Sequence, residues 1–363
     1  MYIFEVAKIA KKVIREKLQA RSLIGKNCYF SNQKSRDMKK VFVLVVLLGY
    51  QSLFPQIYKK SEPFTHTYSI VARDSTTGDI GVAVQSHWFS VGSVVTYGKA
   101  GVGVVATQSL VNPSYGPKGL ALMEQGLSPQ QALNALLAND GGEMYRQVAF
   151  LNTKGEVATH TGKLCIDAAG HKNGKNFSVQ ANMMLNNTVW DAMAKAFEQT
   201  SGTLSERLLA ALKAAENEKG DIRGKQSAAI LIVKGTSTGN SWEDTIMDLR
   251  VEDHENPIAE LERLIKIHNA YDFMNQGDLA MEVGDSKKAE EFYLRAQKIF
   301  PENLEMQYWY AINLLNNKEF EKAHPILESI YKKDNNWKTL TSRLIKSKLL
   351  VISDEELQKI MKL

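Results

Sequence analysis

Residues 67–86 constrain the fold of this 363-residue chain more than any other segment. Two apolar stretches, Tyr68–Arg73 and Ile80–Ser86, flank the polar run 74–79, which contains Gly78. Short apolar segments separated by turn-forming residues are typical of an antiparallel β-hairpin. The sequence therefore predicts a hairpin whose first strand starts at Thr67.

Strand-like segments and pairs of helices alternate from Thr67 to about residue 233. Ser128 followed by Pro129 is a typical start of one of these helices, since serine caps and proline fits the first helical position. Runs of strands separated by helix pairs favour a layered α+β domain over a βαβ repeat. Beyond the hairpin, we expect strands at 93–97, 101–109, 147–152, 157–161, 177–181 and 227–233, and helices at 115–125, 129–138, 188–199 and 204–216.

Helical spacing replaces the strand pattern in residues 256–363, after a predicted linker at 236–255. With position one at Ala270, small residues, an aromatic and a proline fall where a 34-residue tetratricopeptide repeat has them. These residues are Gly277, Gly284, Ala289, Tyr293, Ala296 and Pro301.

A second, weaker repeat is predicted at 304–337, where Lys318 and Asn335 replace the favoured glycine and proline. Residues 338–363 are interpreted as capping helices. A repeat region of this kind implies a protein partner. A plain helical bundle is the alternative interpretation.

The segment 38–56 has two lysines, Lys39 and Lys40, directly before an apolar run, which is the layout of a secretory signal peptide. The run is too short for stable membrane insertion. We therefore expect a secreted or periplasmic protein, with residues 57–66 as a polar lead-in. Residues 1–37 are interpreted either as an extension before the true start or as a basic amphipathic leader.

Charge and cysteine usage exclude two classes of function. The net charge is +5, but residues 1–37 alone carry nine basic and three acidic side chains, so the rest is nearly neutral and suggests no nucleic-acid partner. Cys165 is the single cysteine after the signal, and the histidines show no metal-ligand spacing. We expect no metal and no cofactor.

Thr67 is the candidate nucleophile of the chain. An N-terminal threonine carries its own base, because its α-amino group has a pKa near 8 and can accept the hydroxyl proton. This chemistry requires cleavage between His66 and Thr67, by the chain itself or by another protease. The alternative is an ordinary strand threonine, since β-branched residues favour strands.

The stretch from Thr67 to Asp74, with its turn and the following Gly-Val-Ala-Val strand, resembles the opening hairpin of N-terminal-nucleophile hydrolases. Closer still is the resemblance to family 1028 among the domains of unknown function, which is assigned to that superfamily. The segments that carry it are GVAVQSHWF (81–89), AGVGVVATQ (100–108), NPSYGPKG (112–119), HTGKLC (160–165), FSVQAN (177–182) and DIRGKQSAA (221–229).

The resemblance implies a four-layer αββα sandwich over residues 67–235 and hydrolysis of an amide or peptide bond. Paired copies are common in the superfamily, which suggests a homodimer. Lys99 would lower the pKa of the nucleophile, and Ser86 and Asn182 would hydrogen-bond the α-amino group or the oxyanion. The expected substrate-binding residues are Gln85, His87, Gln108, Asn112, Asp221, Arg223, Gln226 and Ser227.

Several alternatives stay open at this point. The alternative for Lys99 is a solvated turn lysine, and the alternative for Asp221 with Arg223 is a loop ion pair. A non-enzymatic binding or scaffold protein would keep the fold without cleavage before Thr67. An enzyme that uses His87 as an internal base would also need no cleavage.

Overall fold

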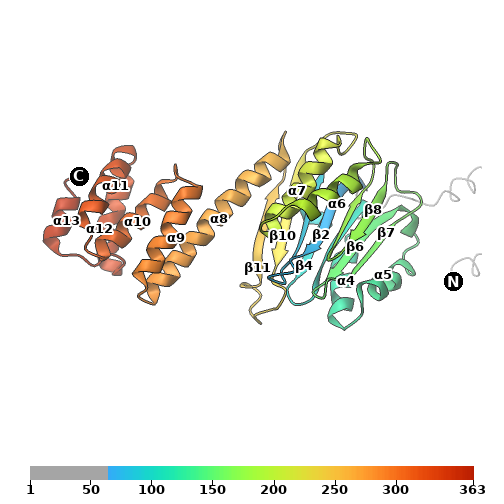
Figure 1. Cartoon of the computed structure of the whole chain (residues 1–363), viewed down its shortest axis with the longest axis horizontal. Coiled ribbons are helices and arrows are strands. Elements are labelled where there is room, and N and C mark those ends of the chain that lie inside the picture. The colour runs from blue at the N-terminus through green and yellow to red at the C-terminus, as the bar shows by residue number, and fades with distance from the viewer. Residues whose placement is uncertain (1–63) are drawn as a thin grey trace, which may run out of the picture. The chain divides into compact units, whose positions relative to one another are not determined.

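The computed structural model describes residues 64–363, whose strands form two antiparallel sheets (Figure 1). The hairpin predicted at 67–86 is confirmed: β2 and β3 pair, with Thr67 opposite Ser86. The expected segments 1–37 and 38–56, and the lead-in before residue 64, lie outside the described residues. The five-stranded sheet consists of β1 (Phe64–Thr65), β4 (Thr96–Lys99), β5 (Gly103–Leu110), β6 (Arg146–Asn152) and β7 (Val157–Thr161).

The six-stranded sheet has the order β11-β10-β3-β2-β9-β8. Its central position is held by the β2–β3 hairpin, which pairs with β10 on one side and β9 on the other. Its strands are β2 (Thr67–Arg73), β3 (Ile80–Ser86), β8 (Gly170–Gly174), β9 (Phe177–Ala181), β10 (Ser227–Val233) and β11 (Thr245–Val251).

Side chains alternate along the strands and thereby build three apolar layers. Val71 and Val82 of the six-stranded sheet meet Val104 and Ala149 of the five-stranded sheet between the two sheets. The outer face of the five-stranded sheet packs under α4 (Tyr115–Glu124) and α5 (Pro129–Leu137).

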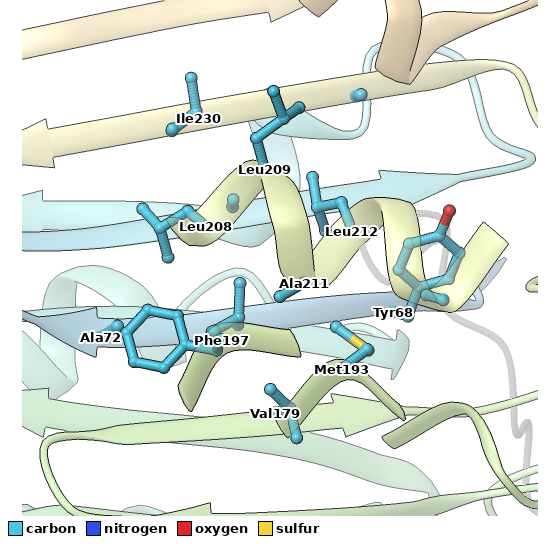
Figure 2. Packing of buried hydrophobic residues seen from close by; sticks show 14 of the residues in the cluster. Tyr68, Ala72, Val179, Met193, Phe197, Leu208, Leu209, Ala211, Leu212 and Ile230 are labelled. Carbon is cyan, nitrogen blue, oxygen red and sulfur yellow. The ribbon is translucent and has the colours of Figure 1, made fainter. Parts of the chain in front are cut away.

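The outer face of the six-stranded sheet packs under α6 (Val189–Gln199) and α7 (Leu204–Asn217). Figure 2 shows Phe197, Leu208 and Leu212 of these helices over Val179 and Ile230 of the strands. The order is therefore helices, sheet, sheet, helices.

The structure differs from the expected strand at 93–97, where the short helix α3 (Gly92–Val95) precedes β4. Val91 and Val95 lie one helical turn apart and are both buried between the sheets. A Cβ on Gly92 would lie 2.5 Å from the Cβ of Ala229, so this turn depends on a close approach to β10. The expected strand is therefore wrong at 93–95, where the apolar residues have helical spacing, and is present at 96–97.

Strand β11 lies inside the expected linker 236–255 and pairs with β10 along its whole length. Its buried Met247 and Val251 alternate with the polar Asp248 and Arg250. This alternation is a strand signal that the sequence contains. Strand β8 carries no such signal because it is a polar edge strand.

Helix α8 (Pro257–Glu282) continues the chain from the sheets into the C-terminal helices. Ile258, Leu261 and Ile265 pack in the apolar layer of the six-stranded sheet, whereas Met274 packs among the C-terminal helices. The helical region expected from residue 256 therefore begins with a helix that contributes to both apolar layers.

From residue 257 to residue 347, each helix packs against the next one along the chain. Gly277 lies against the ring of Tyr293, where a Cβ would come within 2.6 Å of a ring carbon. None of the described helices combines the length and apolar character that crossing a membrane requires. The remaining helices are α9 (Ser286–Ile299), α10 (Leu304–Asn316), α11 (Phe320–Lys333), α12 (Asn336–Ser347) and α13 (Asp354–Ile360), and a 3₁₀ turn covers Glu143–Tyr145.

A largely buried ion pair between Arg146 and Asp140 stabilises the start of β6. The Arg146 side chain is 2% exposed, and its Nε donates to Asp140 Oδ2 at 2.7 Å while its Nη1 donates to the carbonyl of Leu110 at 2.6 Å. Burial alone would raise the pKa of Asp140, but the hydrogen bonds from Arg146, the Gly142 amide and Tyr115 outweigh it and lower the pKa to about 2. The pair is therefore charged at neutral pH.

We predict that Arg146→Ala lowers the free energy of unfolding by about 3–5 kcal/mol, because it leaves the largely buried Asp140 carboxylate without its charged partner. The control is Arg250→Ala, since Arg250 makes an exposed pair with Asp248 worth at most about 1 kcal/mol. Urea unfolding followed by circular dichroism measures both. Equal losses in the two variants would contradict the prediction.

The stabilisation by this pair is expected to depend on pH. The folded-state pKa of Asp140 lies below the unfolded value, so its contribution is complete above about pH 5 and is lost as the pH falls toward about 2. The difference between wild type and Arg146→Ala should therefore shrink between pH 5 and pH 2.5. A difference that stays constant over this interval would contradict the assignment.

Candidate active site

The space between the sheets is apolar at one end and polar at the other. The apolar row of β2 and β3 ends in Thr67, Ser69 and Ser86, which occupy the same sheet face as Val71, Val82 and Val84. Ser178 and Gln180 of β9 lie on this same face. Gln108 and Gln147 lie on the inner face of the five-stranded sheet opposite. All seven polar side chains are fully buried.

Gln147 is the centre of this polar end. Its Nε2 donates to the carbonyl of Ala181 at 2.9 Å, to that of Gly170 at 3.2 Å and to Thr161 Oγ1 at 3.0 Å. Its Oε1 accepts from Gln108 Nε2 at 2.7 Å and from Asn182 Nδ2 at 2.9 Å. One neutral side chain thereby joins both sheets.

The carbonyl groups fix the direction of these amides. A backbone carbonyl only accepts hydrogen bonds, so the Nε2 of Gln147 must face Ala181 and its Oε1 must face Asn182. Asn182 then turns its Nδ2 toward Gln147 and its Oδ1 toward His66. His66 therefore carries a proton on Nδ1, which lies 2.8 Å from that oxygen.

Thr67 is fully buried and held by both its main chain and its side chain. Its carbonyl accepts from the Asn182 amide at 3.1 Å, from Asn182 Nδ2 at 3.3 Å and from Gln108 Nε2 at 3.2 Å. Its hydroxyl donates to the carbonyl of Thr65 at 2.6 Å. The candidate nucleophile thus has a defined position.

The peptide bond between His66 and Thr67 has two donors on its carbonyl oxygen. Ser86 Oγ donates at 2.5 Å and Arg223 Nη2 at 2.9 Å. Burial lowers the pKa of the His66 imidazole; the hydrogen bond with Asn182 raises it, and the Arg223 charge lowers it further. The net shift is downward, so the imidazole is neutral at pH 7.

Asp221 holds Arg223 in this position. Its carboxylate accepts from Arg223 Nε at 3.0 Å and Nη2 at 2.7 Å, and from the Arg223 amide at 2.9 Å. Asp221 is 3% exposed, whereas the Arg223 side chain is 27% exposed. The expected loop ion pair is present, and its guanidinium also reaches the His66 carbonyl.

The structure thus brings six of the sequence-predicted residues together around the His66–Thr67 bond. They contact it directly or through one neighbour, from the ends of four strands and the loop before β10. Within residues 64–363, no group of three or more His, Cys, Asp and Glu side chains is placed to hold a metal ion. The six residues are Thr67, Ser86, Gln108, Asn182, Asp221 and Arg223.

Lys99 does not belong to this group. It forms an exposed ion pair with Glu124 at 2.6 Å, and it pairs with Gly103 at the far end of β5. Gln108 lies five positions after Gly103, which corresponds to about 17 Å of strand. Lys99 is therefore a solvent-exposed lysine, as the alternative interpretation expects. A cation that does lie near Thr67 is Arg223.

Gln85 and His87 flank Ser86 but face elsewhere. Gln85 pairs with Tyr68 and, one residue out of phase with Ser86, points to the helix-covered face of the sheet. The His87 side chain is exposed, and the contact of this residue with the site is its amide, which donates to Asp221 Oδ2 at 3.3 Å. The structure therefore does not support His87 as a buried general base.

The remaining predicted residues have local partners. Asn112 Oδ1 accepts from the Ser114 amide in a turn, and Gln226 Nε2 donates to Asp253. The Ser227 hydroxyl donates to the carbonyl of Trp88 and so anchors the loop after β3. These three side chains do not reach Thr67 through any contact found in the described residues.

Sequence reasoning missed His66, Ser69, Gln147 and Gln180. Gln147 leaves no signal, since it is not part of an alternating polar pattern in β6. Ser69 and Gln180 do leave one, because polar residues at every second position of an otherwise apolar strand mark a polar stripe on one face. FSVQAN (177–182) shows this pattern, as does the start of β2. His66 leaves no signal, since its role depends on where the chain crosses from β1 to β2.

Comparison with known proteins places the chain in a family. The model of a family of unknown function, DUF1028, matches residues 67–261. The crystal structure of protein SPO2555 from Silicibacter pomeroyi, described as DUF1028, is 33% identical with a TM-score of 0.51; the match covers 55% of this chain and 85% of that chain.

A second solved structure, Anbu (ancestral beta-subunit) from Yersinia bercovieri, is 11% identical with a TM-score of 0.28 and is too distant to bear on the fold. That match covers 52% of this chain and 88% of that chain. Among curated proteins, none matches the sequence. Since the family model spans more than half of its residues, the chain belongs to the DUF1028 family of unknown function.

Proposed function

We propose that this protein is an N-terminal-nucleophile hydrolase that cleaves amide bonds with Thr67 after the chain before it has been removed. The order of helices, sheet, sheet and helices supports the αββα sandwich of that superfamily. The observation that carries the proposal is the pair of donors, Ser86 Oγ and Arg223 Nη2, on the carbonyl oxygen of His66.

Two donors on one peptide carbonyl suit cleavage of that bond. When a nucleophile adds to the carbonyl carbon, negative charge develops on the oxygen, and donors already in place stabilise it. Arg223 is permanently charged and is fixed by Asp221. Ser86 and Arg223 thus form an oxyanion site for the His66–Thr67 bond.

The cleavage reaction uses atoms that the chain itself supplies. The Thr67 hydroxyl oxygen adds to the His66 carbonyl carbon, the hydroxyl proton passes to the leaving nitrogen, and the C–N bond breaks. The product is an ester between His66 and the Thr67 oxygen, next to a free Thr67 amine. Water then hydrolyses the ester, which leaves a carboxylate on His66 and Thr67 as the new N-terminus.

The burial of the bond favours cleavage by the chain itself over cleavage by a second protease. Thr65 is 0% exposed and His66 3% exposed. A protease needs an accessible, extended segment and would have to unfold this region first. An intramolecular nucleophile needs no such opening.

The same residues would then serve the enzymatic reaction. The free α-amine of Thr67 accepts the hydroxyl proton, and the oxygen attacks the carbonyl carbon of the substrate. Ser86 and Arg223 donate to the substrate oxygen. Asn182 and Gln108 hold the Thr67 carbonyl and act as positioning residues.

A second function is favoured by one observation. The residues before Thr67 are built into the fold, since β1 pairs with β5 and the Thr67 hydroxyl is bonded to the Thr65 carbonyl. A chain that kept this arrangement permanently would be a binding or scaffold protein. Its α9–α13 helices, proposed as tetratricopeptide-like repeats, would recruit the partner, and the predicted signal at 38–56 would direct export in either case.

We predict that the protein purified from an exporting host has Thr67 as its N-terminus. Intact mass and N-terminal sequencing measure this directly. Thr67→Ala should remain uncut, because it lacks the nucleophile, whereas Thr67→Ser should be cut. A wild-type chain that retains residues 64–66 after prolonged incubation would remove the hydrolase proposal and favour the scaffold.

We predict that Ser86→Ala and Arg223→Gln each slow the appearance of the Thr67 N-terminus by about 10²–10³-fold, since each removes one donor to the developing oxyanion. The rate is followed by mass spectrometry on freshly refolded protein. Ser205→Ala is the control, because it removes another buried serine hydroxyl whose partner is Thr203. Cleavage at the wild-type rate in Ser86→Ala and Arg223→Gln would refute the oxyanion site.

A further inference from the structure

The residues before Thr67 are bound as an extended peptide ligand would be. Phe64 and Thr65 pair antiparallel with Leu110 and Ser109 of β5. Strand β6 occupies one edge of β5, and β4 pairs with the other edge only from Gly103 to Ala106. The end of that second edge is therefore available to a short strand, and β1 fills it.

His66 is recognised through its side chain and its carbonyl at once. Asn182 Oδ1 accepts from His66 Nδ1 at 2.8 Å, while Ser86 and Arg223 donate to the His66 carbonyl oxygen. The direction of the Asn182 amide is fixed by Gln147, so this position offers an acceptor and cannot turn to offer a donor. It selects a side chain that presents an N–H.

The electrostatics of the position favour a neutral group. Burial disfavours an added positive charge on the His66 side chain, and the Arg223 guanidinium next to its backbone acts in the same direction and outweighs the opposing Asp221 carboxylate. An apolar side chain would leave Asn182 Oδ1 buried without a donor, and an acidic one would place two acceptors together. Neutral histidine meets both conditions.

We propose that β1 and His66 occupy the acyl-side substrate site in advance, so that the processed protein cleaves peptide amides after a histidine in an extended segment. This inference rests on the hydrolase proposed above. Release of the upstream peptide empties the β5 edge and the position beside Asn182 without moving Ser86 or Arg223. A substrate peptide then adds as a strand to β5 and places its histidine carbonyl at the oxyanion site.

The test uses three fluorogenic amides and the processed wild-type protein. The first, acetyl-Phe-Thr-His-aminomethylcoumarin, copies residues 64–66; the second has leucine in place of histidine; the third is acetyl-His-aminomethylcoumarin, which lacks the strand. We expect kcat/KM for the first to exceed that for the leucine amide by about tenfold or more, because leucine leaves the Asn182 acceptor unpaired. The truncated amide should lose rate by a similar factor, since it makes no strand pairing.

Asn182→Leu is expected to abolish the preference for histidine over leucine. Because Asn182 also positions Thr67, this variant is judged by the ratio between the two substrates and not by its total rate. Should it fail to fold or to process, the comparison of the three substrates on the wild-type protein still decides the question. Equal rates for the histidine and leucine amides, or no hydrolysis of any of them, would overturn the proposal.

The N-terminus separates this failure from failure of the hydrolase proposal. A protein that starts at Thr67 and cleaves other amides, but shows no preference for histidine, would support the hydrolase proposal and contradict the substrate assignment. A protein that never exposes Thr67 as its N-terminus would contradict both proposals.

Discussion

The hydrogen bonds of Gln147 are the interaction on which this end of the molecule depends. Gln147 belongs to the five-stranded sheet, yet its amide donates to the Gly170 and Ala181 carbonyls of the six-stranded sheet. Its oxygen accepts from Gln108 and Asn182, the two side chains that hold the Thr67 carbonyl. Buried polar groups are costly unless paired, so each member of this network requires the others.

The division between apolar and polar ends separates the burial that holds the two sheets together from the hydrogen bonds that orient the His66–Thr67 bond. The valines between the sheets are stabilised by burial, which is non-directional. Their packing sets the spacing of the sheets but does not orient individual side chains. The amides and hydroxyls at the other end supply direction, since each must satisfy donors and acceptors in fixed places. All of the network's side chains around Gln147 are uncharged, so they orient Thr67 without adding charge to the site.

Elements that follow from hydrophobic periodicity are predicted from the sequence, whereas contacts that depend on the path of the folded chain are missed. The hairpin from Thr67 to Ser86 and the helices at Pro129 and Leu204 follow from local pattern and capping, and they are confirmed. The resemblance to N-terminal-nucleophile hydrolases suggests Lys99, but β4 carries it to the far end of β5. Arg223 lies much further along the chain, and only the folded loop before β10 brings it to the His66 carbonyl.

The position of His66 connects the fold to the proposed chemistry. The chain leaves the five-stranded sheet after Thr65 and enters the six-stranded sheet at Thr67, so His66 must cross between them. At the crossing its carbonyl cannot join either ladder and instead accepts from Ser86 and Arg223. The peptide bond at this crossing is thus the one whose carbonyl accepts from Ser86 and Arg223, which ties the proposed processing to the way the two sheets are joined.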